Sequence, residues 1–142
     1  MLYEQDFQAW INQHIELLKT RQFTELDIDN LIEELDGMAR RDRTELVSRL
    51  IILLAHLSKW QFQPARQSRS WEDAIAEQRV QVLEQLECSP SLQVYLSEAI
   101  AKAYPKAIKL AARETRLEAA VFPVDCPYSQ ADALNENFYP HI

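Results

Sequence analysis

His56 is the residue of this chain best placed to do chemistry, because it is the one polar side chain in the apolar stretch 50–57. A histidine in such a setting can hold or transfer a proton near neutral pH. Helical spacing puts Ile52, Lys59 and Trp60 beside it, so an acidic partner has to come from another helix. The alternative is a core histidine that is hydrogen-bonded to a carboxylate or a carbonyl.

The side chains that can form a pocket with His56 are aromatic or charged and lie on neighbouring segments of the chain. They are Trp60, Arg69, Trp71, Glu77, Arg79, Glu33 and Glu34. Arg79 can reach a carboxylate on the segment that holds His56, and an indole can stack on a guanidinium. These residues predict a small polar pocket that binds an anion, or alternatively a polar network that fixes how helices meet.

Metal and nucleophile chemistry is not indicated by the sequence. Carboxylate-bridged metal sites in helical bundles use Glu-x-x-His pairs, which the chain lacks, so one glutamate of the Glu33-Glu34 pair is expected to be solvated and the other to pair with an arginine. Cys88 and Cys126 have no metal-binding or redox spacing, and no Gly-x-Ser-x-Gly occurs. The sequence predicts no cofactor, no metal and no catalytic residue.

Helices must position these residues. The chain of 142 residues has one glycine, where average usage gives about ten, and this disfavours β-hairpins and glycine-rich nucleotide loops. Apolar residues recur at three and four positions and predict helices at 3–20, 27–62, 70–87 and 90–104, the last kinked or ended by Pro105 before the pattern resumes to 117. Ser70 is expected to be the N-cap of the third of these helices.

The predicted helix 27–62 is expected to be the centre of the fold, since residues 50–57 are apolar on nearly every side. A break at Gly37 is the alternative to one continuous helix. The apolar positions of this helix keep one phase along its length: Ile28, Leu31, Leu35, Met38, Leu46, Leu50, Leu53, Leu57 and Trp60.

The last segment, 119–142, is rich in proline and aromatic residues and is expected to pack on the bundle. Ser129 is expected to cap a short helix that ends near Leu134. The predicted fold is all-α: a bundle of four to five helices around one long central helix, with an aromatic C-terminal tail, in a single domain of residues 1–142.

The net charge of −7 is unevenly distributed along the chain. Residues 1–36 contain nine acidic and two basic side chains, whereas a basic stripe at 102–116 carries five positive charges without interleaved aromatic residues. This balance disfavours nucleic-acid binding and favours a protein partner or self-association. The acidic N-terminus is unlike a signal peptide, and the run 50–55 is too short to span a bilayer, so a cytoplasmic location without membrane contact is expected.

Several short motifs follow one another in a specific order along nearly the whole chain. They are Tyr3-x-x-Asp6-Phe7-x-x-Trp10, Asp29-Asn30-Leu31-x-Glu33-Glu34-Leu35, Leu54-x-His56-Leu57-x-Lys59-Trp60, Ser70-Trp71, Glu77-Gln78-Arg79, Ser89-Pro90-Ser91-Leu92, Phe122-Pro123, Cys126-Pro127-Tyr128 and Phe138-Tyr139-Pro140. This set resembles the domain of unknown function 29 family, which is abundant in cyanobacteria and other bacteria. The resemblance implies an all-helical domain in the bacterial cytoplasm and no established activity, cofactor or catalytic residue.

Two hypotheses for the function follow from the sequence. The first is a non-catalytic helical interaction module that binds a protein partner or a second copy of itself. The alternative is an enzyme or binder of a small molecule or anion, with its polar pocket around His56.

Overall fold

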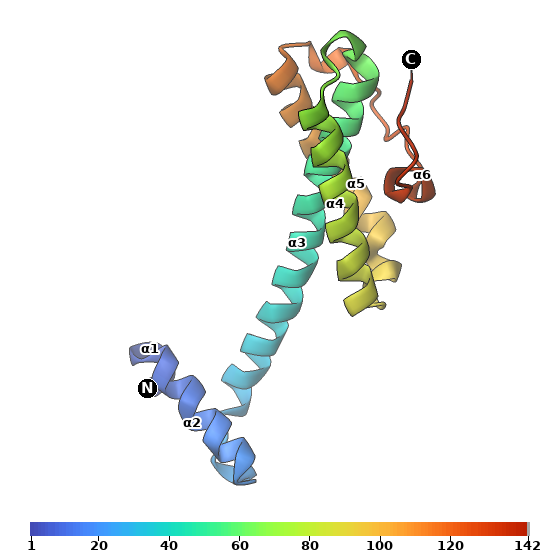
Figure 1. The fold of residues 1–142 in the computed structure, drawn as a ribbon. Helices are drawn as coiled ribbons and strands as arrows, with labels where there is room; N and C mark the ends of the chain where they lie inside the picture. Colours follow the sequence, from blue (N-terminus) through green and yellow to red (C-terminus); the bar gives the residue numbers. More distant parts are fainter. Residues whose placement is uncertain (142) are drawn as a thin grey trace. The chain divides into compact units, whose positions relative to one another are not determined.

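The computed structural model describes residues 1–141 as helices joined by short connections (Figure 1). The six α-helices are α1 Leu2–Gln5, α2 Phe7–Lys19, α3 Ile28–Phe62, α4 Arg69–Cys88, α5 Leu92–Thr115 and α6 Gln130–Leu134, with 3-10 turns at Phe23–Glu25, Pro64–Arg66 and Ala119–Val121. The described residues contain no strand, so the predicted all-helical class is confirmed.

The chain divides into two compact units, Met1–Arg41 and Asp42–Ile142, which are described separately below. Helix α3 contributes residues 28–41 to the first unit and residues 42–62 to the second. It passes Gly37 without interruption, so the continuous helix is correct and the break is not. The single domain expected from the sequence stays a prediction.

The core of the second unit is built around its part of α3. Leu46, Leu50, Leu53 and Leu57 have no exposed surface. Alanines of α5 recur every four residues against this core, and all four are fully buried: Ala99, Ala103, Ala107 and Ala111. Small side chains in such a row let two helix axes approach closely. Helices α4 and α5 therefore enclose the leucine-rich part of α3 (Figure 1).

One helix start differs from the expected one, and the alternative left open at Pro105 is decided. Helix α4 begins at Arg69 because the hydroxyl of Ser68, not that of Ser70, accepts a hydrogen bond from the N–H of Trp71 at 3.3 Å. Pro105 lies inside α5, which continues to Thr115. Proline removes the N–H that would bond to the carbonyl four residues earlier, and both Ala101 and Pro105 are exposed, so water can solvate that carbonyl.

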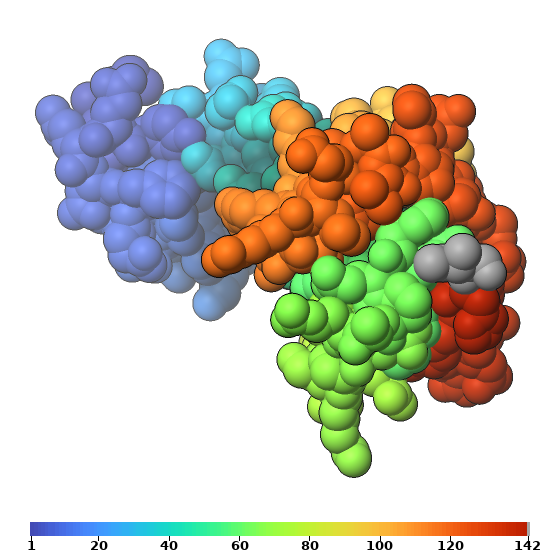
Figure 2. Space-filling model, turned by 90° about the horizontal axis from the view of Figure 1, so that it is seen from above, coloured from blue at the N-terminus to red at the C-terminus, as the bar shows by residue number. Residues whose placement is uncertain are grey.

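The C-terminal segment adds aromatic side chains to the same core. Phe122 and Tyr128 are buried, and the Tyr128 hydroxyl donates a hydrogen bond to Oε1 of Gln61 at 2.8 Å. Ser129 caps α6 by accepting from the N–H of Asp132 at 3.1 Å, as the sequence indicated. Seen from above, the orange and red tail lies beside the green end of α3 and start of α4 (Figure 2).

We expect Leu53→Ala to lower the free energy of unfolding by about 2–5 kcal/mol, because it opens a cavity at a fully buried position. The measurement is the urea midpoint, with Val94→Ala as the control because Val94 is 89% exposed. An unchanged midpoint for Leu53→Ala would show that this part of α3 is not central to the core.

Candidate functional site

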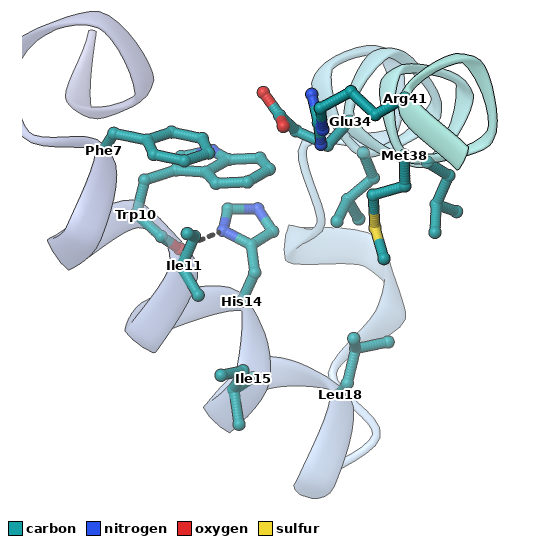
Figure 3. Close-up of a pocket in the computed structure, with 11 residues that line it drawn as sticks. Phe7, Trp10, Ile11, His14, Ile15, Leu18, Glu34, Met38 and Arg41 are labelled. Atoms are coloured by element: carbon teal, nitrogen blue, oxygen red, sulfur yellow. Dashed lines mark hydrogen bonds between the residues drawn. The ribbon is translucent and has the colours of Figure 1, made fainter. Parts of the chain in front are cut away.

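The first unit is a helical hairpin that contains an apolar groove of about 470 Å³ between α2 and residues 28–41 of α3 (Figure 3). The lining side chains are largely aliphatic or aromatic, with one acid and one base. We call this the hairpin groove; it is lined by Phe7, Trp10, Ile11, His14, Ile15, Leu18, Leu31, Glu34, Leu35, Met38 and Arg41.

The apolar spacing on each helix explains why these side chains meet. On α2, Ile11, Ile15 and Leu18 follow one another at intervals of four and three residues, which places them on one face. On α3, Leu31, Leu35 and Met38 are spaced in the same way. Each helix therefore presents a continuous apolar row, and the two rows form the walls of the hairpin groove.

A hydrogen-bonded cluster fixes the angle of the hairpin. The N–H of Asp27 donates to Nε2 of His14 at 2.9 Å, so this nitrogen carries no proton and Nδ1 donates to the carbonyl of Trp10 at 3.0 Å. The Trp10 indole N–H in turn donates to the Asp27 carboxylate at 3.2 Å. A hydrogen bond from the Asn30 side chain lowers the pKa of Asp27 against the opposing effect of burial.

Most of the apolar surface of the hairpin is exposed. The only buried side chains of this unit are those of Trp10 and His14. By contrast, Leu35 is 64%, Ile32 60% and Met38 58% exposed. Ten of the sixteen large exposed apolar residues in the described chain lie in these first 41 positions. Ile28, Leu35 and Met38 continue the apolar phase of the helix, but nothing in their own unit covers them.

His14 and Glu34, two of the polar residues that line the hairpin groove, are engaged by their own chain, whereas Arg41 has no hydrogen-bond or ion-pair partner among residues 1–141. Both ring nitrogens of His14 are used in hydrogen bonds. The Glu34 carboxylate accepts from the Tyr3 hydroxyl at 2.5 Å, and this bond, together with desolvation and the negative charge of nearby acids, raises the pKa of Tyr3 to about 12. The groove therefore offers apolar contact rather than proton transfer.

His56 lies half-buried on α3 in the second unit, where its Nδ1 is 2.8 Å from the carbonyl of Ile52. Burial lowers the pKa of His56, with a further contribution from Lys59. The structure brings Lys59 and Trp71 together, since the Lys59 ammonium is 4.8 Å from the centre of the Trp71 ring. Lys59 is only 4% exposed, and its charge is paired with Glu114 at 3.6 Å. Glu114 was not among the residues expected here.

Arg79 is buried and binds the C-terminal tail instead of a carboxylate on the long helix. Its Nε donates to the carbonyl of Ala133 at 2.9 Å, and Nη2 donates to those of Phe138 at 2.7 Å and Asp132 at 3.4 Å. The guanidinium also lies over the ring of Tyr139 at 5.4 Å. The expected ion pair is therefore replaced by backbone carbonyls, which fits the structural-network interpretation of this residue.

The other predicted pocket residues lie in different surroundings. Trp60 packs on Tyr139, with ring centres 4.9 Å apart, whereas Arg69 is exposed. Glu77 is also exposed and accepts a hydrogen bond from Gln81 at 2.9 Å.

Glu33 and Glu34 belong to the first unit, and Glu33 lies 3.7 Å from Arg40. In the second unit, Tyr139 contacts both the Trp60 ring and the Arg79 guanidinium. The Lys59 ammonium, which lies near His56, contacts the ring of Trp71. Arg69 and Glu77 are exposed and belong to neither group, and the pocket around His56 stays a prediction.

Within residues 1–141, no three histidine, cysteine, aspartate or glutamate side chains lie close enough together to bind a metal ion. Over the same residues, every helix falls short of the length and apolar content needed to cross a bilayer.

Comparison with known proteins identifies one family. The model of the family described as domain of unknown function DUF29 matches residues 2–139. No curated protein and no solved structure matches the chain.

We expect Arg79→Met to lower the free energy of unfolding by about 3 kcal/mol, because three tail carbonyls lose a charged donor that methionine cannot replace. The measurement is the urea midpoint together with limited proteolysis of residues 124–138. Arg69→Met is the matched control, since Arg69 is exposed. A tail that remains resistant to protease in Arg79→Met would contradict this role.

We also expect stability to fall as the pH drops below about 6.5, the ordinary pKa of histidine. Burial lowers the pKa of His56 in the folded chain, so the unfolded chain takes up the proton first and is favoured by acid. Lys59 and Glu114 are the charged groups near this imidazole. The urea midpoint should decline between pH 7 and pH 5, and His56→Gln should reduce that decline. If the urea midpoint of His56→Gln declined by the same amount, the loss of stability in acid would come from groups other than His56.

Proposed function

We propose that this chain, which belongs to the family of the domain of unknown function DUF29, is a non-catalytic interaction module that binds a helical segment of a protein partner in its hairpin groove. The observation that carries the proposal is the exposed apolar surface of the hairpin, with Ile32, Leu35 and Met38 each more than half exposed.

The size of the hairpin supports this proposal. A unit of 41 residues with two buried side chains has little core of its own, and chains of this length usually need a further stabilising contact. Contiguous apolar patches on a surface commonly mark sites of protein interaction. The free energy of burying the hairpin groove would thus be gained on binding a partner.

The shape of the groove supports a helical occupant. Its walls are two helices with apolar residues at intervals of three and four, which is the arrangement into which the ridge of a third helix packs. The cluster of Trp10, His14 and Asp27 holds the walls in place before binding, which reduces the entropy cost of association.

Site-specific cross-linking tests the proposal in the intact protein. With p-benzoylphenylalanine in place of Leu35, irradiation of the native host cells should join the chain to a protein through this position. The matched control carries the same group at Val94, which is 89% exposed but lies outside the hairpin, and should give no such product. Absence of a product at Leu35, or equal yields at both positions, would contradict the proposal.

A further inference from the structure

We infer that copies of this chain associate with one another through opposite charges: the basic stripe of α5 in one copy binds an acidic face of the hairpin in the next copy. Neither surface lines the hairpin groove. The contact therefore goes beyond the proposed function and leaves the groove free for its own partner.

The basic stripe is a continuous surface of unpaired cations. Its five side chains are all exposed and follow one another at intervals of four, three, four and three residues: Lys102, Lys106, Lys109, Arg113 and Arg116. At about 100° per residue, the first four fall within an arc of about 60° on α5, and the fifth follows at the end of the helix. Within residues 1–141, none of the five forms an ion pair.

The acids near the basic stripe are too few to neutralise it. Glu98 lies one turn before Lys102 on the same face, and Asp125 of the tail lies at one edge, where it shares a cavity with residues of α5. Glu114 is already paired with Lys59 at 3.6 Å. Five cations beside two free carboxylates leave the stripe with a net positive charge.

The hairpin has an acidic face with the same spacing. Asp29, Glu33 and Asp36 follow one another on α3 at intervals of four and three residues, and all three are exposed. We call them the acidic face. Helical spacing places them on the side of α3 opposite the residues that line the groove. Arg40 pairs with Asp36 and lies 3.7 Å from Glu33, so three carboxylates share one guanidinium and the face stays negative.

The two surfaces match in spacing as well as in charge. A helix returns to nearly the same face every seven residues, or about 10 Å along its axis, so carboxylates at intervals of four and three can each lie opposite a cation. Lys106, Lys109 and Arg113 offer the intervals in reverse order, which suits an antiparallel helix. Charged residues with this repeat select partners and orientation between helices in coiled coils.

A second copy fits the basic stripe better than nucleic acid does. The hairpin carries most of the negative charge of the chain, −5 of −7, from nine acidic and four basic residues. Repulsion between whole chains is limited, since salt screens charges more than about 8 Å apart. A nucleic acid would extend past the stripe over a negatively charged chain, and no aromatic side chain lies between the exposed cations for its bases to stack on.

Sedimentation velocity of the full chain tests whether copies associate. The average sedimentation coefficient should rise with protein concentration at about 0.1 M salt, because copies then come together reversibly. At about 1 M salt it should fall to the value of a monomer, because the screening length drops from about 10 Å to about 3 Å.

Two triple variants locate the contact. Asp29→Asn/Glu33→Gln/Asp36→Asn removes the acidic face, and Lys106→Gln/Lys109→Gln/Arg113→Gln removes the centre of the basic stripe. Each variant alone should associate about tenfold more weakly than the unchanged chain. An equimolar mixture of the two should associate again, because each variant keeps the surface that the other lacks.

Matched controls remove the same charge from other exposed positions and should associate like the unchanged chain. They are Glu72→Gln/Asp73→Asn/Glu84→Gln for the acidic face and Lys19→Gln/Arg66→Gln/Arg69→Gln for the basic stripe. Far-UV circular dichroism of each variant establishes that the helices remain.

Three results would overturn the self-association. The first is an unchanged chain that stays monomeric at every concentration, and the second is a mixture of the two variants that stays monomeric. The third is a labelled DNA duplex that binds the full chain and is lost by the basic-stripe variant, which would assign the stripe to nucleic acid. None of these results touches the cross-link at Leu35, so the proposed function stands or fails separately.

Discussion

Apolar residues on nearly every side of α3 between positions 50 and 57 have to be shielded from water, and the second unit is arranged to do this. Its parts contribute in different ways. Helix α5 presents alanines, which let it approach α3 closely, while α4 adds Ile75 and Val82. The tail closes the remaining side with Phe122 and Tyr128. Because the tail has little regular structure, Arg79 holds it through three backbone carbonyls.

In the first unit, much less of the apolar surface of α3 is covered by other elements. Residues 28–41 keep the apolar spacing of the buried part, but only α2 packs against them. A single neighbouring helix covers a narrow strip, so Ile32 and Leu35 remain in water. What the hairpin has in place of a core is a set of directional bonds among Trp10, His14 and Asp27. Such bonds fix geometry well but contribute less free energy than a buried apolar cluster.

The contrast between Leu35 and Leu53 shows how much of the structure could be predicted from the sequence. Both occupy the same apolar phase of one helix, and periodicity correctly predicted that helix and its continuity past Gly37. Periodicity describes which face is apolar, not whether another element covers it, so Leu53 is fully buried while Leu35 is 64% exposed. The N-cap of α4 was misplaced by two residues for a local reason. Ser68 and Ser70 are equally good caps by residue type, and only backbone geometry distinguishes them.

Site residues were harder to predict than helices, because their partners come from distant segments. A carboxylate was the expected partner of Arg79, but the acceptors are main-chain carbonyls more than fifty positions away, which no side-chain pattern encodes. The partner of Lys59 is Glu114 on α5, and it too is visible only after folding. In the second unit, buried charges such as these hold helices and tail together. In the hairpin, by contrast, Asp29, Glu33 and Asp36 are exposed, and helical spacing places them on the side of α3 that is turned away from the groove-lining residues. Charges that stay in water interact weakly, so these carboxylates contribute little to the stability of the hairpin.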